Sequence, residues 1–178
     1  MTNKQRLFIH DLMAELLQLK KNKVIWAYQK RMPRQEKPFA TLRIYSEQLE
    51  AMAELLQDGD TVHAVAPSAF VLEVQYFGRG DEEPQDKIMG MIRRLELPSV
   101  VDRCAAARVA FFDAEPVQDL STLLDNQDWE RRAAVDLHVR YSYAMHDDNG
   151  SDTGDIFETI DTVDNVTIDG KLTENGGN

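Results

Sequence analysis

The feature that most constrains the fold is a run of strict alternation between Arg132 and Tyr143. Every second position is apolar: Ala133, Val135, Leu137, Val139, Tyr141 and Tyr143. Successive side chains of a strand point to opposite faces of a sheet, so the run predicts a long strand with one covered and one solvated face. Its apolar face needs helices to cover it. We expect Val135, Leu137 and Val139 to lie under the first helix.

Three segments have helical periodicity. The first helix is predicted from apolar residues at three- and four-residue spacing, with Thr2 or Asn3 as its cap: Phe8, Ile9, Leu12, Met13, Leu16 and Leu17. The second begins near Pro84 and ends by Leu97, because Pro98 follows. A short third helix from Ser99 is predicted to share one apolar side: Val100, Val101, Cys104 and Ala105.

Further strands are predicted where β-branched and aromatic residues gather between turn residues. These segments are Val24–Gln29, Phe39–Tyr45, a region from Thr61 to Gly78 broken by Pro67, and Val109–Phe112, with short edge strands at Phe157–Thr159 and Val166–Leu172. A basic loop with Pro33 and Pro38 joins the first two.

The segment from Ser46 to Gln57 has two interpretations. Leu49, Met52 and Leu56 fit a helix capped by Ser46, which local propensity favours. The alternation of Leu49 and Leu55 with acids, together with the Asp58–Asp60 turn, favours a long hairpin instead. The sequence leaves both open.

Together these segments predict an α/β chain of the α+β type. We expect a mixed, mainly antiparallel sheet with two main helices on one face, and a hairpin arm if residues 47–66 are strands. The length of 178 residues suits one domain, predicted to cover 1–172, with a flexible tail at 173–178.

The charge is unevenly distributed along the chain. Residues 1–44 hold ten Lys/Arg and three Asp/Glu, a net charge of +7, which leaves −18 for the remainder of a chain whose total is −11. A basic end of one copy could therefore meet an acidic end of the next, and charge complementarity of this kind orients an association. The alternative is a solvated surface with an acidic tail.

Compartment and membrane signals are absent. No apolar run approaches the ~18 residues of a membrane span, and the charged N-terminal segment is not a secretory signal. Cys104 is the only cysteine, which excludes an internal disulfide. We expect a protein made in a reducing bacterial cytoplasm, with no membrane partner.

No motif predicts catalysis, a metal or a cofactor. The Gly78–Pro84 segment lacks the third glycine and the lysine of a phosphate-binding loop. His138 with His146, Asp147 and Asp148 is a weak metal candidate, because ligands must converge from fixed elements. Cys104 is expected to be a buried structural residue. The basic residues 20–43, interleaved with Trp26 and Tyr28, are more typical of a protein contact than of nucleic-acid binding in a chain with pI near 4.8.

Several stretches, in order, resemble a phage family. They are VIWAYQKRMPRQEKPFATLRI (24–44), AFVLEVQYFG (69–78), LPSVVDRCAAA (97–107) and, most strongly, EPVQDLSTLLDNQDWERRAAVDLHVRY (115–141). This order is similar to that of phage neck and tail terminator proteins. The resemblance covers roughly Leu7 to Ile168, and the acidic tail beyond Asp161 departs from it.

The resemblance implies a tail-terminator-like fold and a non-enzymatic virion protein. It implies a homo-oligomeric ring, commonly a hexamer, that caps the tail tube, joins it to the head-side connector and leaves a channel in which DNA passes without specific binding. Candidate assembly contacts are Lys30, Arg31, Arg34, Lys37, Asp119 and Trp129. The competing hypotheses are a small hydrolase or nuclease with a His–Asp site and a monomeric host-directed binding protein.

Overall fold

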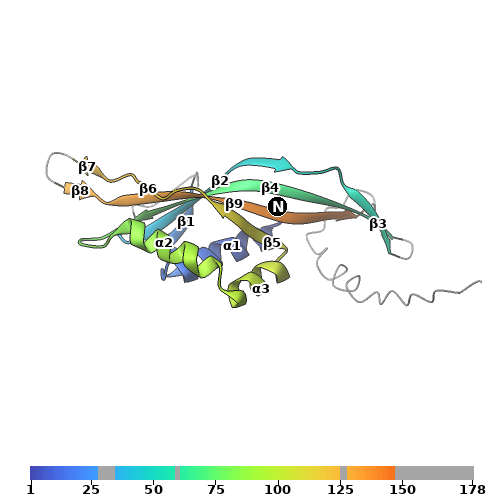
Figure 1. Ribbon diagram of the computed structural model, residues 1–178, viewed down its shortest axis with the longest axis horizontal. Coiled ribbons are helices and arrows are strands. Elements are labelled where there is room, and N and C mark those ends of the chain that lie inside the picture. The colour runs from blue at the N-terminus through green and yellow to red at the C-terminus, as the bar shows by residue number, and fades with distance from the viewer. Residues whose placement is uncertain (28–34, 59–60, 125–127, 147–178) are drawn as a thin grey trace, which may run out of the picture.

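The fold is a twisted sheet with a helical layer on one face. The structure, a computed structural model, describes residues 1–27, 35–58, 61–124 and 128–146. The helices are α1 (Asn3–Leu16), α2 (Pro84–Leu95) and α3 (Pro98–Ala106), with a 3₁₀ turn, η1 (Lys21–Lys23), after α1. Figure 1 shows all three helices beneath the sheet. The predicted α+β class, with its helices on one face, is confirmed.

Nine strands are described. They are β1 (Val24–Trp26), β2 (Phe39–Leu49), β3 (Glu54–Asp58), β4 (Thr61–Phe77), β5 (Val109–Ala114), β6 (Gln118–Asp119), β7 (Thr122–Leu124), β8 (Asp128–Glu130) and β9 (Arg132–His146). Seven form one sheet in the order β1-β2-β4-β9-β5, in which β3 also pairs with β4 and β6 with β9. Only the β1–β2 pairing is parallel among these described strands. β7 and β8 form a separate two-stranded ribbon.

The long alternating strand is confirmed as β9, an interior strand of the sheet between β4 and β5. Its apolar residues pair across β4 in register, with Val135 opposite Val74 and Leu137 opposite Leu72. These side chains are buried in one core with residues of α1 and α2. Both helices contribute to the cover of β9: α2 makes the larger contact with this strand, while α1 packs on β1 and α2 and reaches β9 through Gln5. Periodicity could not show this division, because it identifies the apolar face of a helix but not the strand beneath it.

Local sequence signals explain how the helices start. Thr2 Oγ1 accepts a hydrogen bond from the Gln5 backbone N–H (3.1 Å), and the Gln5 side chain accepts one from Thr2 N–H (3.0 Å), a capping box. The buried Gln5 also donates to the Ser142 carbonyl (3.2 Å), which ties α1 to β9. Pro84 and Pro98 open α2 and α3, where a missing N–H costs nothing.

Two details of the prediction were wrong. β4 is not broken at Pro67, which lies within the strand opposite Ser142. Proline has no N–H to donate. On the side of β4 where that N–H would point, β2 ends at Leu49 and β3 begins only at Glu54, so the sheet loses no hydrogen bond. On α3, Val100 and Cys104 are buried, but Val101 and Ala105 are exposed, because the short helix contacts the core along only one edge.

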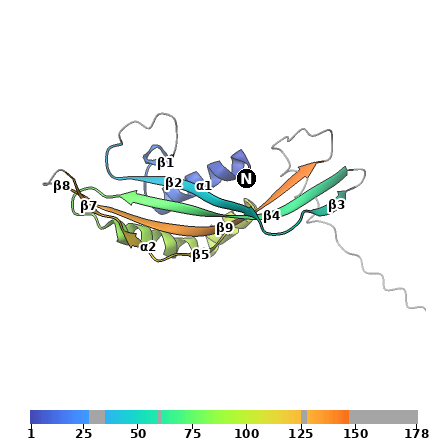
Figure 2. The same ribbon diagram turned by 90° about the horizontal axis from the view of Figure 1, so that it is seen from above.

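The ambiguous segment forms a hairpin. β3 pairs antiparallel with β4, with Glu54 opposite Val65. Before it, β2 carries a bulge in which Ser46 and Glu47 lie between the paired residues Tyr45 and Gln48, with Ser46 in the left-handed conformation (φ 53°). A bulge bends and twists its strand. β3 and the adjoining ends of β2, β4 and β9 therefore extend past the helices as a projection, here called the arm (Figure 2).

The C-terminal predictions fall outside the described residues. These are the edge strands at 157–159 and 166–172 and the tail at 173–178. The single domain over 1–172 thus stays a prediction.

Candidate assembly surfaces

The arm exposes apolar side chains to solvent. Leu49, Met52 and Leu55 lie where β2 ends and β3 begins, and Met52 is 92% exposed. An exposed strand edge with apolar side chains promotes association with another chain, which is why isolated proteins usually charge or cover such edges. The arm is therefore a candidate contact surface.

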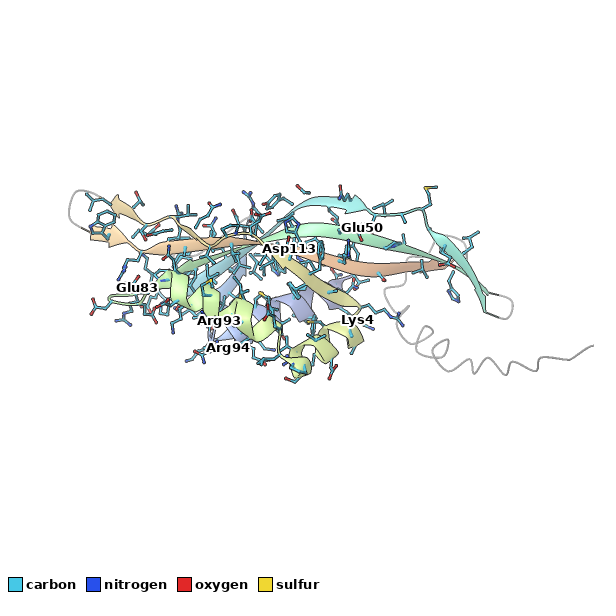
Figure 3. All side chains as sticks on the ribbon, viewed as in Figure 1. Lys4, Glu50, Glu83, Arg93, Arg94 and Asp113 are labelled. Carbon is cyan, nitrogen blue, oxygen red and sulfur yellow. The ribbon has the colours of Figure 1, made fainter. Side chains whose placement is uncertain are left out.

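The arm is also acidic. Between Ile44 and Gly78 the chain has six Asp/Glu and no Lys or Arg. Glu50 accepts a hydrogen bond from Arg140 Nε (2.8 Å), and Glu47 accepts one from the Tyr141 hydroxyl (2.5 Å), so β9 holds two of these acids at the base of the arm. Figure 3 shows Glu50 along the strands, on the side of the sheet away from the helices.

The opposite end of the molecule carries a second apolar surface, the β7–β8 ribbon. Its residues Leu123 and Trp129 are direct cross-strand partners. Both are exposed, Trp129 at 65%. A two-stranded ribbon is marginally stable in water, and cross-strand apolar pairs are its main support. Figures 1 and 2 place this ribbon and the arm at opposite ends of the long axis.

The basic loop reaches the ribbon. Lys37, at its C-terminal end, forms an ion pair with Glu130 of β8 (3.3 Å). Arg131, directly after β8, donates to Glu83 at the start of α2, which Figure 3 shows at this same end. Lys30, Arg31 and Arg34 lie outside the described residues. The structure thus brings together Lys37 and the strand that carries Trp129, two of the predicted contact residues.

Asp119 has a local structural role. It lies on β6, opposite Ala133 of β9, and accepts a hydrogen bond from the Ser121 backbone N–H (2.9 Å). Hydrogen bonds from the Ser121 side chain and backbone lower the pKa of Asp119. The carboxylate therefore shapes the turn that leads into the ribbon.

The open face of the sheet is a network of paired charges. Arg43 contacts Glu73 (3.3 Å) and lies over the Tyr45 ring, while His138 contacts Glu115 (3.2 Å). The Tyr45 hydroxyl donates to Asp136 (2.5 Å). Among these described residues, Arg43 and His138 therefore each face a carboxylate, which balances their charge on this face.

One prediction follows from the Tyr45–Asp136 hydrogen bond. The carboxylate and burial raise the pKa of Tyr45 to about 12. A raised tyrosine pKa contributes stability below the unfolded value near 10, and that contribution is lost as pH rises through the folded value. Asp136→Asn should move one tyrosine transition toward pH 10 in an absorbance titration at 295 nm. An unchanged titration curve would show that the hydrogen bond has no such effect.

The candidates for chemistry do not gather into a site. His138 contacts Glu115 on the open face, and the side chain of His146 lies outside the described part of the chain. Among the described residues, no group of three His, Cys, Asp or Glu could hold a metal ion. Cys104 is buried, as expected, and burial raises its thiol pKa, which disfavours the reactive thiolate.

The sequence did not predict the arm and ribbon as exposed apolar surfaces. The alternation at Leu49–Leu55 was visible, but alternation does not say whether a face is covered. The sequence held a usable signal for the ribbon, because Asp125 and Asn126, between Leu123 and Trp129, are residue types that favour turns.

Comparison with known proteins identifies the family of this chain. No curated protein sequence matches the chain. Among the described residues, no helix is long and apolar enough to cross a membrane. The family model described as phage neck terminator protein matches residues 6–175, nearly the whole chain. The chain therefore belongs to the phage neck terminator protein family.

Proposed function

We propose that this protein acts as one subunit of a closed ring at the end of the tail. The ring, commonly of six copies in the family it resembles, caps the tail tube and joins it to the head-side connector. Its role is structural, and no reaction is assigned to it. Its family supports a structural role in the neck of the virion. The formation of a ring is what we add by this proposal.

The observation that carries the proposal is the pair of projections at opposite ends of the subunit. The arm and the ribbon extend beyond the helix-covered core and expose Leu49, Met52, Leu55, Leu123 and Trp129. A monomer would leave all of these in water. Contacts made through two different surfaces generate a ring when the rotation between copies closes.

The basic loop is proposed as a further contact. Lys30, Arg31, Arg34 and Lys37 place four cations between two strands, and Lys37 anchors one end of the loop on β8. Charged loops on a rigid scaffold are common contact sites. We assign the loop to acidic groups of a neighbouring subunit or neck protein.

The proposal also gives a reason for the net negative charge of the chain. A ring around a DNA passage benefits from a surface that repels phosphate, because cations at the wall would bind the backbone and slow the genome. The net charge of −11 and the paired charges of the open face are consistent with such a passage.

A genetic experiment tests this function. In a phage that lacks the gene, we expect filled heads and assembled tubes that do not join, and plasmid-borne protein should restore whole virions. Normal head–tail joining in the absence of the protein would overturn the proposal.

A further inference from the structure

We infer that the outer edge of β5 binds an extended, basic segment of a partner protein, which joins the sheet as an added strand. The segment would place an apolar side chain in the hollow between β5 and α2, and a Lys or Arg side chain beside Glu96 and Asp113. This surface is separate from the arm and the ribbon, and its partner is a different protein rather than a second copy, so the site goes beyond the proposed ring.

β5 is the last strand on its side of the sheet, and its outer edge is open. The order β1-β2-β4-β9-β5 ends there, and Figure 2 shows β5 at the margin of the sheet beside α2. Ser142 N–H donates to the Arg108 carbonyl (3.2 Å) and Glu115 N–H to the Asp136 carbonyl (2.8 Å), so residues 108 and 115 both face β9.

Two residues between these points turn their backbone groups away from β9. Alternate residues of an antiparallel strand face the same neighbour, and the bulge at Phe112 shifts the alternation by one residue. Val109 and Phe111 therefore direct their N–H and C=O groups outward. Among the described residues, none forms a hydrogen bond with these outward groups. A segment of another chain can pair with them as a strand.

The opposite edge of the sheet is closed. β1, which lies there, has only three residues. Val24 N–H donates to the Lys21 carbonyl, and His10 Nε2 donates to the Val24 carbonyl (2.9 Å). Very short edge strands resist pairing with another chain, so β5 is the better acceptor of the two edges.

A hollow beside β5 can receive a side chain of the added strand. It has a volume of about 470 Å³ and lies between β5 and the C-terminal end of α2. Phe112, at its rim, is 47% exposed. An added strand gains affinity from main-chain hydrogen bonds, and pockets for its alternate side chains give specificity. The apolar lining is formed by Ile92, Leu95, Phe111, Phe112, Ala114 and Leu137.

The charges of the hollow favour a basic segment. Glu96 and Asp113 are the charged groups among the described residues that line it, and neither forms an ion pair with another described residue. The basic residues at this end of α2, Arg93 and Arg94, do not line the hollow, and Arg94 donates to the Leu16 carbonyl of α1 (2.6 Å). Two carboxylates without cationic partners are complementary to Lys or Arg.

The exposed strands of this chain do not match these acids. None of β3, β6, β7 and β8 has a Lys or Arg, and three of them carry acids. Pairing of β5 with β5 of a second copy would bring the same acids together. Residues 147–178 contain nine acids and one lysine. The loop at 28–34 is basic, but Pro33 lacks the N–H that an added strand donates. A different protein is therefore the expected source of the strand.

Photo-cross-linking in infected cells tests the site. Benzoylphenylalanine in place of Phe112, supplied from a plasmid to a phage that lacks the gene, should link to one other phage protein on irradiation. Mass spectrometry should locate the link in an extended segment that alternates apolar residues with Lys or Arg. The same photoreactive residue in place of Leu7, which is 62% exposed on α1, is the control and should not give this product.

Removal of the two charges tests the complementarity. Glu96→Gln with Asp113→Asn keeps the size of both side chains and the acceptor that Asp113 offers to Ala114 N–H (2.9 Å). This pair should lose most of the Phe112 cross-link while the denaturation midpoint stays unchanged. Asp81→Asn with Asp102→Asn removes two exposed acids outside the hollow and should keep the cross-link. Equal cross-linking in both variants would overturn the basic character of the partner.

Hydrogen exchange tests the edge in the isolated protein. The amides of Val109 and Phe111 should exchange faster than that of Ala110, which faces β9. Equal protection of all three would show that the edge is already covered and would overturn the inference.

The remaining outcomes separate the site from the proposed ring. A Phe112 cross-link to a second copy of this chain, to residues 147–178 or to nothing in infected cells would overturn the inference and leave the ring standing. Normal head–tail joining in the absence of the protein would overturn the proposed function, whereas the cross-link to a basic strand would still establish the site.

Discussion

Leu137→Ala is expected to lower the free energy of unfolding by about 2–5 kcal/mol, the cost of truncating a fully buried leucine. Leu137 is 1% exposed and lies in the interior strand β9, where it pairs with Leu72 of β4 and Ala114 of β5. α2 packs on this strand, so neither the sheet nor the helix can collapse freely into the cavity. Chemical denaturation of the two proteins measures the difference.

The neighbouring position provides a matched control. His138 points to the open face, where it contacts Glu115 at a partly exposed site. Exposed ion pairs contribute about 0–1 kcal/mol, so His138→Ala should cost much less than Leu137→Ala. Equal costs would mean that the burial of the two faces of β9 has been assigned wrongly.

The combined change Arg31→Glu and Arg34→Glu is expected to block head–tail joining. Reversing two of the four cations of the loop replaces attraction to acidic neighbours with repulsion. Stability should change by less than about 0.5 kcal/mol, since surface substitutions rarely do more. Complementation of a phage that lacks the gene should then give free tails and free filled heads.

The control is an equal charge reversal elsewhere. Lys4→Glu with Arg93→Glu alters two exposed cations outside the basic segment, one on α1 and one on α2, both labelled in Figure 3. This variant should yield normal virions if the loop acts through its position. Normal yield from the Arg31/Arg34 variant would remove the loop from assembly.

The sequence predicted those parts of the fold that depend on local periodicity. The alternation of β9 and the helical spacing of α1 each identify one element and its buried face, because burial repeats with the geometry of the backbone. The starts of α1 at Thr2 and α2 at Pro84 were also readable, since caps and N-terminal prolines act locally.

Features that depend on long-range pairing were not readable. Helical propensity and alternation competed in 46–57, and the pairing of β3 with β4 decided the outcome. Pro67 was predicted to break a strand, but the end of β2 removes the need for its N–H. The larger share of α2 in the cover of β9 likewise depends on tertiary packing rather than on a local pattern.

The candidate contact residues also differ in how far the sequence alone could identify them. Lys37 was found from its charge and the prolines around it, and the structure adds its ion pair with β8. Trp129 was singled out from a family-like motif, but its exposure beside Leu123 required the ribbon. The arm was not predicted as a candidate contact surface, because hydrophobic patterning alone does not distinguish a core face from an exposed one.

Electron microscopy of tail tubes mixed with the purified protein tests the central claim most directly. Tubes from a phage that lacks the gene should acquire a ring with a central opening at one end only. The protein should also shift in mass from 20.3 kDa to a closed oligomer when tubes are present. A protein that stays monomeric at high concentration and never marks a tube end would contradict its assignment as the ring that terminates the tail.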